Sequence, residues 1–489
     1  MNIALFALAL IIFLIAYMLF RTSRLSKFPQ PAAPVDKPDI DQKIVSTHLA
    51  ELIRFRSIST ESSAGFDPQP FLDIHRWIDN TYPLLTKNLE KTCINQYSLL
   101  YVWKGSDLKL TPVLFNAHLD VVPVEESTLP EWKVEPFGGV IREGCIWGRG
   151  AIDMKSHATG LLEAVEALIR SGYQPKRTIY LAFGHDEEIM GFNGTKKIVE
   201  HLKNRGVQLA ALLDEGGLIS IGMLPGVQDP FALVGISEKG YMTLQLSAAG
   251  SPGHASQPGR QTAVGILARA IALMDDHPLP ARLDYFLPTL EKLAYMLPFR
   301  MQFLIANAWL FRGLLIKNLE KSPQMNALIR TTHAATMIHG GIKDNVLPAS
   351  VTAKINFRLL PGDSMDAVIA YEKKVIGDPR VEIKVDEANG GWEASPVSPL
   401  DTPAYRSLEL VTRQVFDNVA VAPFVFPAAT DSHHYQPICA NIFKFSPFAL
   451  TLDEQHGMHG INERIQQKTF MGMIAFYMRI MRVWGDAEF

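Results

Sequence analysis

Cysteine is scarce in this sequence of 489 residues, which contains only Cys93, Cys145 and Cys439. The three are odd in number, lie far apart and form no C-x-x-C pair. This pattern excludes a disulfide framework and a zinc site built from thiolates. We therefore interpret the cysteines as packing residues, and the compartment need not be oxidising.

An excess of basic charge is also absent. The 47 Lys and Arg residues are outnumbered by 50 Asp and Glu residues, which gives a formal net charge of −3. No Lys/Arg cluster stands out in the soluble part, and no internal repeat or low-complexity tract is present. We therefore expect no nucleic-acid partner. With 47% hydrophobic residues, a chain of this length predicts a large core divided between domains.

One long hydrophobic run is present, at residues 3–20, and it contains no charged residue. Its length approaches that of a bilayer span, so we predict a single-pass transmembrane helix. A cleaved signal peptide is the alternative, but the run is long for one and no basic residue precedes it. Arg21, Arg24 and Lys27 follow the run and favour a cytoplasmic location for the catalytic part. Residues 29–38, which carry four prolines, predict a spacer.

Potential metal ligands follow three apolar runs, each typical of a short buried strand. The runs at 113–115, 178–183 and 209–213 are followed by His118 and Asp120, by Glu187 and Glu188, and by Asp214. A further carboxylate, Asp153, precedes a predicted helix at 155–171. Ligands bind at the carboxyl ends of strands in open α/β sheets. Because imidazole and carboxylate suit a divalent metal better than a core, we interpret these strand ends as an active site.

Strand and helix patterns alternate in the first half of the chain, which predicts an α/β fold with a mainly parallel sheet flanked by helices. The later order β-α-β-β-α-β is the ferredoxin-like arrangement and predicts an inserted α+β lid domain. We expect an anchor and spacer at 1–39, a catalytic domain at 40–235 and 389–489, and a lid or dimerisation domain at 236–388.

Six motifs occur in the order HLDVVP, GRGAIDMK, DEEIMG, LLDEGG, SPGHAS and HGINE. Together they resemble the co-catalytic dizinc metallopeptidases that include carboxypeptidase G, aminoacylase and the succinyl-diaminopimelate desuccinylases. The resemblance covers nearly all of the chain after the spacer. LLDEGG, residues 326–332 and NVLPASVTAKINFRLLPGD at 345–363 are most similar to the branch of carboxypeptidase S and the N-fatty-acyl-amino-acid synthase/hydrolases. The resemblance implies two Zn²⁺ ions as cofactors.

The resemblance implies a role for each potential ligand. His118 and Glu188 would bind separate zinc ions, and Asp153 would bridge the two. Asp214 would complete one site and His459 the other. A bridging carboxylate sets the short spacing at which two metals act on one bond.

The resemblance also implies roles in catalysis and substrate binding. Asp120 would accept the ring N–H of His118, and Glu187 would act as general base. His254 would polarise the scissile carbonyl, in many relatives across a dimer. Arg358 and Asn345 would hold the free carboxylate of the substrate, although Asn345 could equally be a turn residue.

Two further features follow from the resemblance. The family tends to have a cis peptide bond after the bridging residue, which here joins Asp153 and Met154. In residues 430–434, of sequence TDSHH, related branches often carry an arginine after the serine, whereas this chain has His433.

An unusually apolar segment, residues 280–323, interrupts the predicted lid. Arg300 and Arg312 lie within it and disfavour a second membrane span. One interpretation is a pair of buried helices, such as those of a dimer interface. The alternative is a segment that lines an apolar groove for a long acyl chain or dips into the bilayer beside the anchor.

The expected function is that of a membrane-anchored zinc hydrolase that cleaves an amide bond next to a free carboxylate in a small-molecule substrate. N-acyl amino acids, including N-fatty-acyl ones, are the first substrate class. The alternative is a carboxypeptidase or dipeptidase of the carboxypeptidase S type. A membrane-tethered binding protein without activity is a third possibility, but the general base at Glu187 favours an enzyme. A homodimer is a possible assembly.

Overall fold

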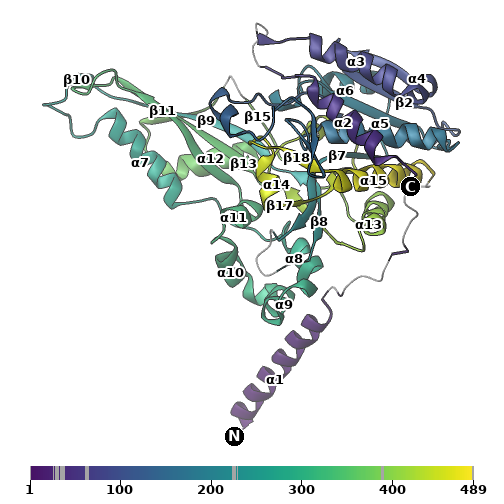
Figure 1. Ribbon diagram of the computed structural model, residues 1–489. Coiled ribbons are helices and arrows are strands. Elements are labelled where there is room, and N and C mark those ends of the chain that lie inside the picture. The colour runs from purple at the N-terminus through teal and green to yellow at the C-terminus, as the bar shows by residue number, and fades with distance from the viewer. Residues whose placement is uncertain are drawn as a thin grey trace.

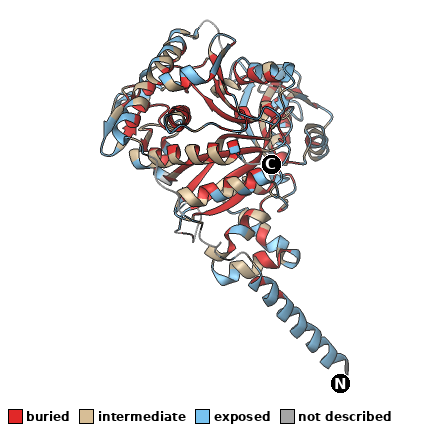
Figure 2. Ribbon diagram, turned by 90° about the vertical axis from the view of Figure 1, so that its right-hand side faces the viewer, coloured by how far each residue is buried: buried red, intermediate tan, exposed pale blue. Residues whose placement is uncertain are grey.

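The computed structural model describes residues 2–25, 27, 32–33, 39–60, 65–222, 227, 229–386 and 390–486 (Figure 1). Helix α1 (Asn2–Ser23) projects away from the rest of the chain, and most of its side chains are exposed (Figure 2). It is long and apolar enough to cross a membrane, and both a membrane anchor and a signal sequence have these properties. The predicted spacer at 29–38 lies outside the described residues, apart from residues 32 and 33.

An eight-stranded mixed sheet forms the centre of the larger part of the chain, with strands in the order β1-β2-β6-β3-β7-β17-β8-β16. Its strands are β1 (Glu90–Ile94), β2 (Ser98–Trp103), β3 (Val113–His118), β6 (Ile179–Gly184), β7 (Ala211–Ile221), β8 (Phe231–Glu238), β16 (Ala420–Phe426) and β17 (Ile442–Thr451). Strands β6, β3, β7 and β17 are parallel.

The prediction of a mainly parallel sheet holds for these central strands and for the pair β8 and β16. Strands β1 and β2 are antiparallel to each other, and β2 is antiparallel to β6. Only a short turn joins β1 to β2, and a parallel pair would need a crossover of a dozen or more residues. Strand β7 is also longer than the run at 209–213 predicted, because it continues alongside β17 and β8.

Helices cover both faces of this sheet. Phe115 and Leu114 are successive residues of β3, so they point to opposite faces and belong to separate hydrophobic clusters. Trp484 stacks on Phe115, with ring centroids 5.5 Å apart. The helices on the Phe115 side are α2 (Gln42–Arg54), α3 (Gln69–Thr81), α4 (Pro83–Asn88), α5 (Lys155–Arg170), α13 (Pro403–Val415) and α15 (Gln467–Asp486). The Leu114 side is covered by α6 (Thr195–Asn204) and the 3-10 turn η5 (Asp431–Tyr435).

A second, antiparallel sheet has the strand order β11-β13-β9-β14, with β15 also paired to β9. The elements follow the predicted β-α-β-β-α-β order: β9 (Gly240–Ala249), α7 (Ala263–Asp276), β11 (Thr332–Gly340), β13 (Ser350–Leu359), α12 (Met365–Ile376) and β14 (Val381–Val385), with β15 (Gly391–Trp392) after them. At the outer end of this sheet, β10 (Gly253–His254) pairs with β12 (Val346–Leu347) (Figure 1).

The apolar segment between α7 and β11 folds into several short helices rather than a pair. They are α8 (Leu287–Leu293), the 3-10 turn η4 (Ala294–Met296), α9 (Phe299–Ala306), α10 (Ala308–Leu319) and α11 (Pro323–Ile329). They enclose a small hydrophobic cluster of their own that includes Phe286, Leu290 and Ile305. This cluster lies next to the end of α1 (Figure 1).

A three-stranded sheet joins the end of the chain to the long connection that follows β3. Its strands are β4 (Val140–Arg142), β5 (Cys145–Trp147) and β18 (Arg464–Gln466), and the connection also holds the 3-10 turn η2 (Glu126–Glu131). Pairing of β18 with β5 places the loop after α14 (Leu452–Gly457) against the segment that leads to α5. Residues more than 300 positions apart in sequence are thus brought side by side.

Candidate metal centre

Three strands of the large sheet deliver polar side chains to one place. Strand β3 ends at His118, β6 is followed by the 3-10 turn η3 (Glu187–Ile189), and β7 passes through Glu215. Side-chain atoms of His118, Glu187 and Glu215 all lie within 4.8 Å of one another. The three apolar runs therefore end at a common group of imidazole and carboxylate ligands.

Asp153 lies between two histidines from distant parts of the chain. Its Oδ1 is 3.1 Å from Nε2 of His118, and its Oδ2 is 3.0 Å from Nε2 of His459. The same nitrogen of His459 lies 3.2 Å from Oε2 of Glu188. A carboxylate placed in this way is suited to bridge two cations. The peptide bond between Asp153 and Met154 is cis, as the resemblance implies.

Asp120 orients both His118 and the turn that follows β6. Its carbonyl oxygen accepts a hydrogen bond from Nδ1 of His118 at 3.0 Å, and its Oδ1 lies 3.3 Å from the same nitrogen. The carboxylate also accepts the backbone N–H groups of Glu187 and Glu188, at 3.1 and 3.0 Å, and the hydroxyl of Ser59 at 2.6 Å. With Nδ1 protonated, Nε2 of His118 keeps its lone pair for a cation.

Glu463 holds the segment that carries Asp153. Its buried carboxylate pairs with Arg149 at 2.6 Å and accepts the backbone N–H groups of Gly150, Ile152 and Asp153 at 3.1, 2.7 and 3.1 Å. The resemblance implied no role for Glu463, although it is the last residue of the HGINE motif. That motif was the signal that could have found it.

Glu215 lies at the centre, although the resemblance implied a ligand role for Asp214 and none for its neighbour. Oε1 of Glu215 lies 3.5 Å from Nε2 of His118. Oδ1 of Asp214 instead accepts a hydrogen bond from the side-chain amide of Asn116 at 3.0 Å. The register of β7 with β17 is irregular between Asp214 and Gly217, and the two carboxylates do not share one position. Geometry therefore favours Glu215 as the ligand beside His118.

The centre holds more negative charge than its own residues neutralise. Burial, with repulsion from Asp153, raises the pKa of Glu215 to about 8. Burial also raises the pKa values of Glu187, Glu188 and Asp214. Among the described residues, the buried atoms Glu188 Oε1 and Asp214 Oδ2 have no hydrogen-bond partner. Divalent cations would supply the missing positive charge, and imidazole with carboxylate is a ligand set that Zn²⁺ accepts, so the residues fit such an ion.

His254 and Asn345 lie outside this centre in a single chain. Both are exposed at the outer end of the second sheet, where β10 is drawn far from the large sheet (Figure 1). There the N–H of Ala255 donates to the carbonyl of Asn345 at 3.0 Å. Arg358 is near the opposite end of β13, whose 10 residues span roughly 30 Å at about 3.4 Å per residue. One chain therefore does not bring Asn345 and Arg358 together.

Arg358 begins a stack of side chains that reaches the 430–434 loop. Its guanidinium carbon lies 5.0 Å from the ring centroid of Tyr241. Tyr241 stacks on Trp392 at 4.8 Å, and Trp392 stacks on His433 at 5.2 Å with the ring planes 8° apart. His433 stands where related branches carry an arginine, so in this chain the loop contributes an aromatic contact.

This geometry matches a known family. The model of the family described as "Peptidase family M20/M25/M40" matches residues 114–483. This span contains every residue of the centre from His118 to His459. The chain belongs to this peptidase family. It is a metallohydrolase, as the motifs predicted.

Two relatives represent the two kinds of protein in the branch named by the resemblance. The chain is 37% identical over 442 residues to the probable carboxypeptidase S-like 2 of Dictyostelium discoideum, which covers 90% of this chain and 84% of that protein. It is also 37% identical over 415 residues to the N-fatty-acyl-amino acid synthase/hydrolase PM20D1 of Xenopus tropicalis, which covers 83% of this chain and 79% of that protein. The predicted branch of the family is confirmed.

Solved structures agree in fold. The M20 family metallo-carboxypeptidase Sso-CP2 of Sulfolobus solfataricus superposes with a TM-score of 0.64 at 17% identity, covering 91% of this chain and 100% of that one. Human carnosine dipeptidase 1 superposes with a TM-score of 0.62 at 16% identity, covering 91% and 96%. At these identities the likeness shows the M20 α/β fold alone.

The two adjacent carboxylates can be told apart by metal affinity. We expect Asp214→Asn to lower zinc affinity only modestly, because the Asp214 carboxylate accepts a hydrogen bond from Asn116, which is not one of the proposed ligands. Glu215→Gln should lower it further, because it removes a ligand. Zinc per chain is measured by elemental analysis after dialysis against buffered zinc. A larger loss in Asp214→Asn than in Glu215→Gln would return the ligand role to Asp214.

Proposed function

We propose that this M20 metallohydrolase is a membrane-anchored dizinc amidohydrolase that cleaves the C–N bond of N-acyl amino acids, including N-fatty-acyl ones, next to the free carboxylate. The observation that carries the proposal is the position of Asp153, whose two oxygens face His118 and His459. The name of the Xenopus relative supports the substrate class. The name of the Dictyostelium relative supports carboxypeptidase activity as the second candidate.

In this proposal, His118, Asp153 and Glu215 would hold one zinc ion, and Asp153, Glu188 and His459 would hold the other. When bound, the ions would act as a Lewis acid for the scissile carbonyl. They would also lower the pKa of water, so that a hydroxide nucleophile is available at neutral pH. The protein positions the ligands: Asp120 is hydrogen-bonded to His118, and Glu463 is hydrogen-bonded to the backbone at Asp153.

Glu187 is the proposed general base. Its Oε2 lies 3.8 Å from Nε2 of His118, and its backbone N–H is bound by Asp120. Burial raises its pKa well above the usual range, which suits a group that takes a proton from water and passes it to the leaving nitrogen. Its neighbour Glu188 faces His459 and so serves the metal instead.

Arg358 is the proposed contact for the substrate carboxylate. A planar guanidinium can donate two parallel hydrogen bonds to a carboxylate. The guanidinium carbon lies over the ring of Tyr241, 5.0 Å from its centroid, and this contact holds the side chain in place.

His254 requires a second chain if it is to polarise the scissile carbonyl. It is exposed at the outer end of the second sheet. Strand β11 at the edge of the same sheet is also largely exposed, and such an edge is open to pairing with another chain. We propose a homodimer in which each chain supplies His254 to its partner, with Asn345 beside it.

The proposed division of the chain follows from these roles. Residues 1–39 anchor the enzyme, 40–235 and 389–489 form the catalytic domain, and 236–388 form the lid and dimerisation domain. Arg21, Arg24 and Lys27, which follow the apolar run at residues 3–20, favour a cytoplasmic catalytic part.

The first test is turnover by the zinc-loaded protein on N-acyl amino acids and dipeptides. We expect release of free amino acid from the N-acyl substrates, and a loss of about 10²–10⁴-fold in Glu187→Gln because the proton acceptor is removed. Zinc content should stay unchanged. Glu200→Gln, an exposed change on α6, is the control. Cleavage of dipeptides alone would favour the carboxypeptidase alternative, and cleavage of neither would contradict the proposal.

Recognition of the carboxylate is tested by Arg358→Lys. An ammonium cannot reproduce the two-point contact, so kcat/KM for a free acid should fall by about tenfold relative to the corresponding amide, since hydrogen bonds to charged groups are worth about 1.5–3 kcal/mol. Arg380→Lys, an exposed arginine after α12, serves as control. An unchanged ratio of acid to amide would assign recognition to another residue.

The shared site is tested by mixing variants. Glu187→Gln and His254→Ala chains, with different tags, are co-expressed and the mixed dimer is purified. One of its sites combines an intact Glu187 with an intact His254 from the other chain, so about half of the normal activity should return. If each variant is inactive and the mixed dimer is too, His254 does not act across chains.

A further inference from the structure

Helices α9 and α10 expose large apolar side chains on the outside of the protein. Phe299, Trp309, Leu310 and Leu314 are 62%, 54%, 48% and 47% exposed. The opposite sides of the two helices pack into their own cluster through residues such as Ile305. Both sides of these helices are therefore apolar. Several large apolar side chains exposed on two packed helices point to an interaction surface.

This surface lies where α1 leaves the body of the protein (Figure 1). Nε of Arg21 donates to the carbonyl of Ala306 at 2.9 Å, and the side-chain amide of Asn307 donates to the carbonyl of Met18 at 3.2 Å. Met18 and Thr22 are buried by this contact, whereas the earlier part of α1 has no protein around it (Figure 2). The end of α9 thus packs against the end of the predicted span, and α10 packs against α9.

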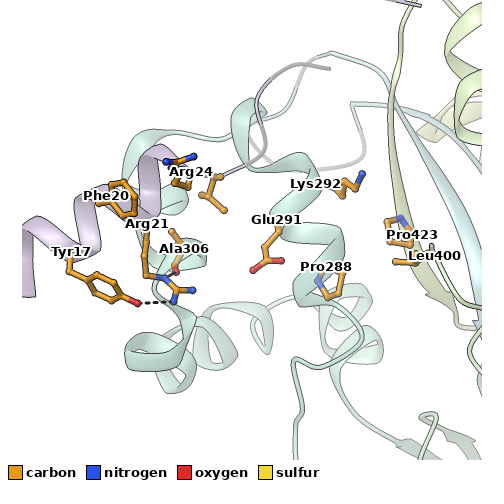
Figure 3. Close-up of a pocket in the computed structure, with 11 residues that line it drawn as sticks. Tyr17, Phe20, Arg21, Arg24, Pro288, Glu291, Lys292, Ala306, Leu400 and Pro423 are labelled. Carbon is orange, nitrogen blue, oxygen red and sulfur yellow. Dashed lines mark hydrogen bonds between the residues drawn. The ribbon is translucent and has the colours of Figure 1, made fainter. Parts of the chain in front are cut away.

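Charged and aromatic side chains gather at the same junction. A cavity of about 560 Å³ lies between the end of α1 and α8, and it is lined in part by Tyr17, Arg21, Arg24 and Lys292 (Figure 3). Nη1 of Arg21 donates to the hydroxyl of Tyr17 at 3.5 Å, and the guanidinium of Arg24 lies over the Phe20 ring. Basic and aromatic residues at the end of an apolar span are typical of the level of lipid headgroups.

We infer that α9 and α10 lie in the interfacial layer of the bilayer that α1 enters. This inference rests on the proposed anchor role of α1 and deepens it. The enzyme is then attached to the membrane at two places, through the span and through the interfacial face. These two attachments set its orientation on the membrane. The partner of the face is the lipid surface and not a second copy of the chain. Lipid is favoured because α9 contacts the end of the apolar span, which places both helices at the surface of the bilayer that the span enters.

The test uses the full chain in phosphatidylcholine–phosphatidylserine vesicles, with the photoreactive residue p-benzoylphenylalanine placed at Phe299 or at Leu314. After illumination, adducts are identified by mass spectrometry. Leu108 is the control, because it is 74% exposed in the connection between β2 and β3, away from α1. Lipid adducts at Phe299 and Leu314 should exceed those at Leu108 by at least severalfold. Lipid adducts no higher than those at Leu108 would overturn the inference, and so would adducts to a second protein chain.

A third position separates this inference from the proposal on which it rests. Leu8, in the middle of α1, is 54% exposed and should form lipid adducts if α1 is an anchor. Lipid adducts at Leu8 without any at Phe299 or Leu314 would leave the anchor intact and refute the interfacial face. No lipid adducts at any of the three positions would refute both.

Discussion

The metal centre depends on where Asp153 is held. Its two oxygens can face His118 and His459 only if the segment before α5 keeps its place against the loop that carries His459. Glu463 secures this, because one buried carboxylate binds the backbone at Ile152 and Asp153 and pairs with Arg149. Loss of one partner of a buried ion pair leaves an uncompensated charge and costs about 3–5 kcal/mol. The support is therefore as important as the ligands.

A similar support lies on the other side of the centre. Asp120 binds His118 through its carbonyl and the backbone of Glu187 and Glu188 through its carboxylate. One residue thereby sets the tautomer of a ligand and the position of the proposed base. The parallel strands β3 and β6 bring these groups together, because their carboxyl ends lie at one edge of the sheet. Strand pairing brings the ligand side chains close together. The carboxylates of Asp120 and Glu463 then fix the backbone segments that carry these side chains.

Much of this arrangement was predictable. Buried strands followed by His118, Glu187 and Glu188 are local patterns, and the six motifs in order identified the family before any geometry was known. The β-α-β-β-α-β order of the second sheet was also readable from periodicity. The mixed direction of the large sheet was not, because it depends on how β1 and β2 pair with β6. The number of helices in 280–323 was likewise missed, since an apolar run alone does not say where helices end.

The sequence by itself determined which residue types stand at the ends of the strands, and hence the family and the class of reaction. Only the tertiary structure decided which of them face one another. The sequence alone does not distinguish Asp214 from Glu215 as a metal ligand. In the structure, the path of β7 places Glu215 near His118. Glu463 acquired its role from the pairing of β18 with β5. The physical reason is that strand identity and motif order are properties of neighbours in the chain, whereas the direction of a side chain depends on contacts between segments hundreds of residues apart.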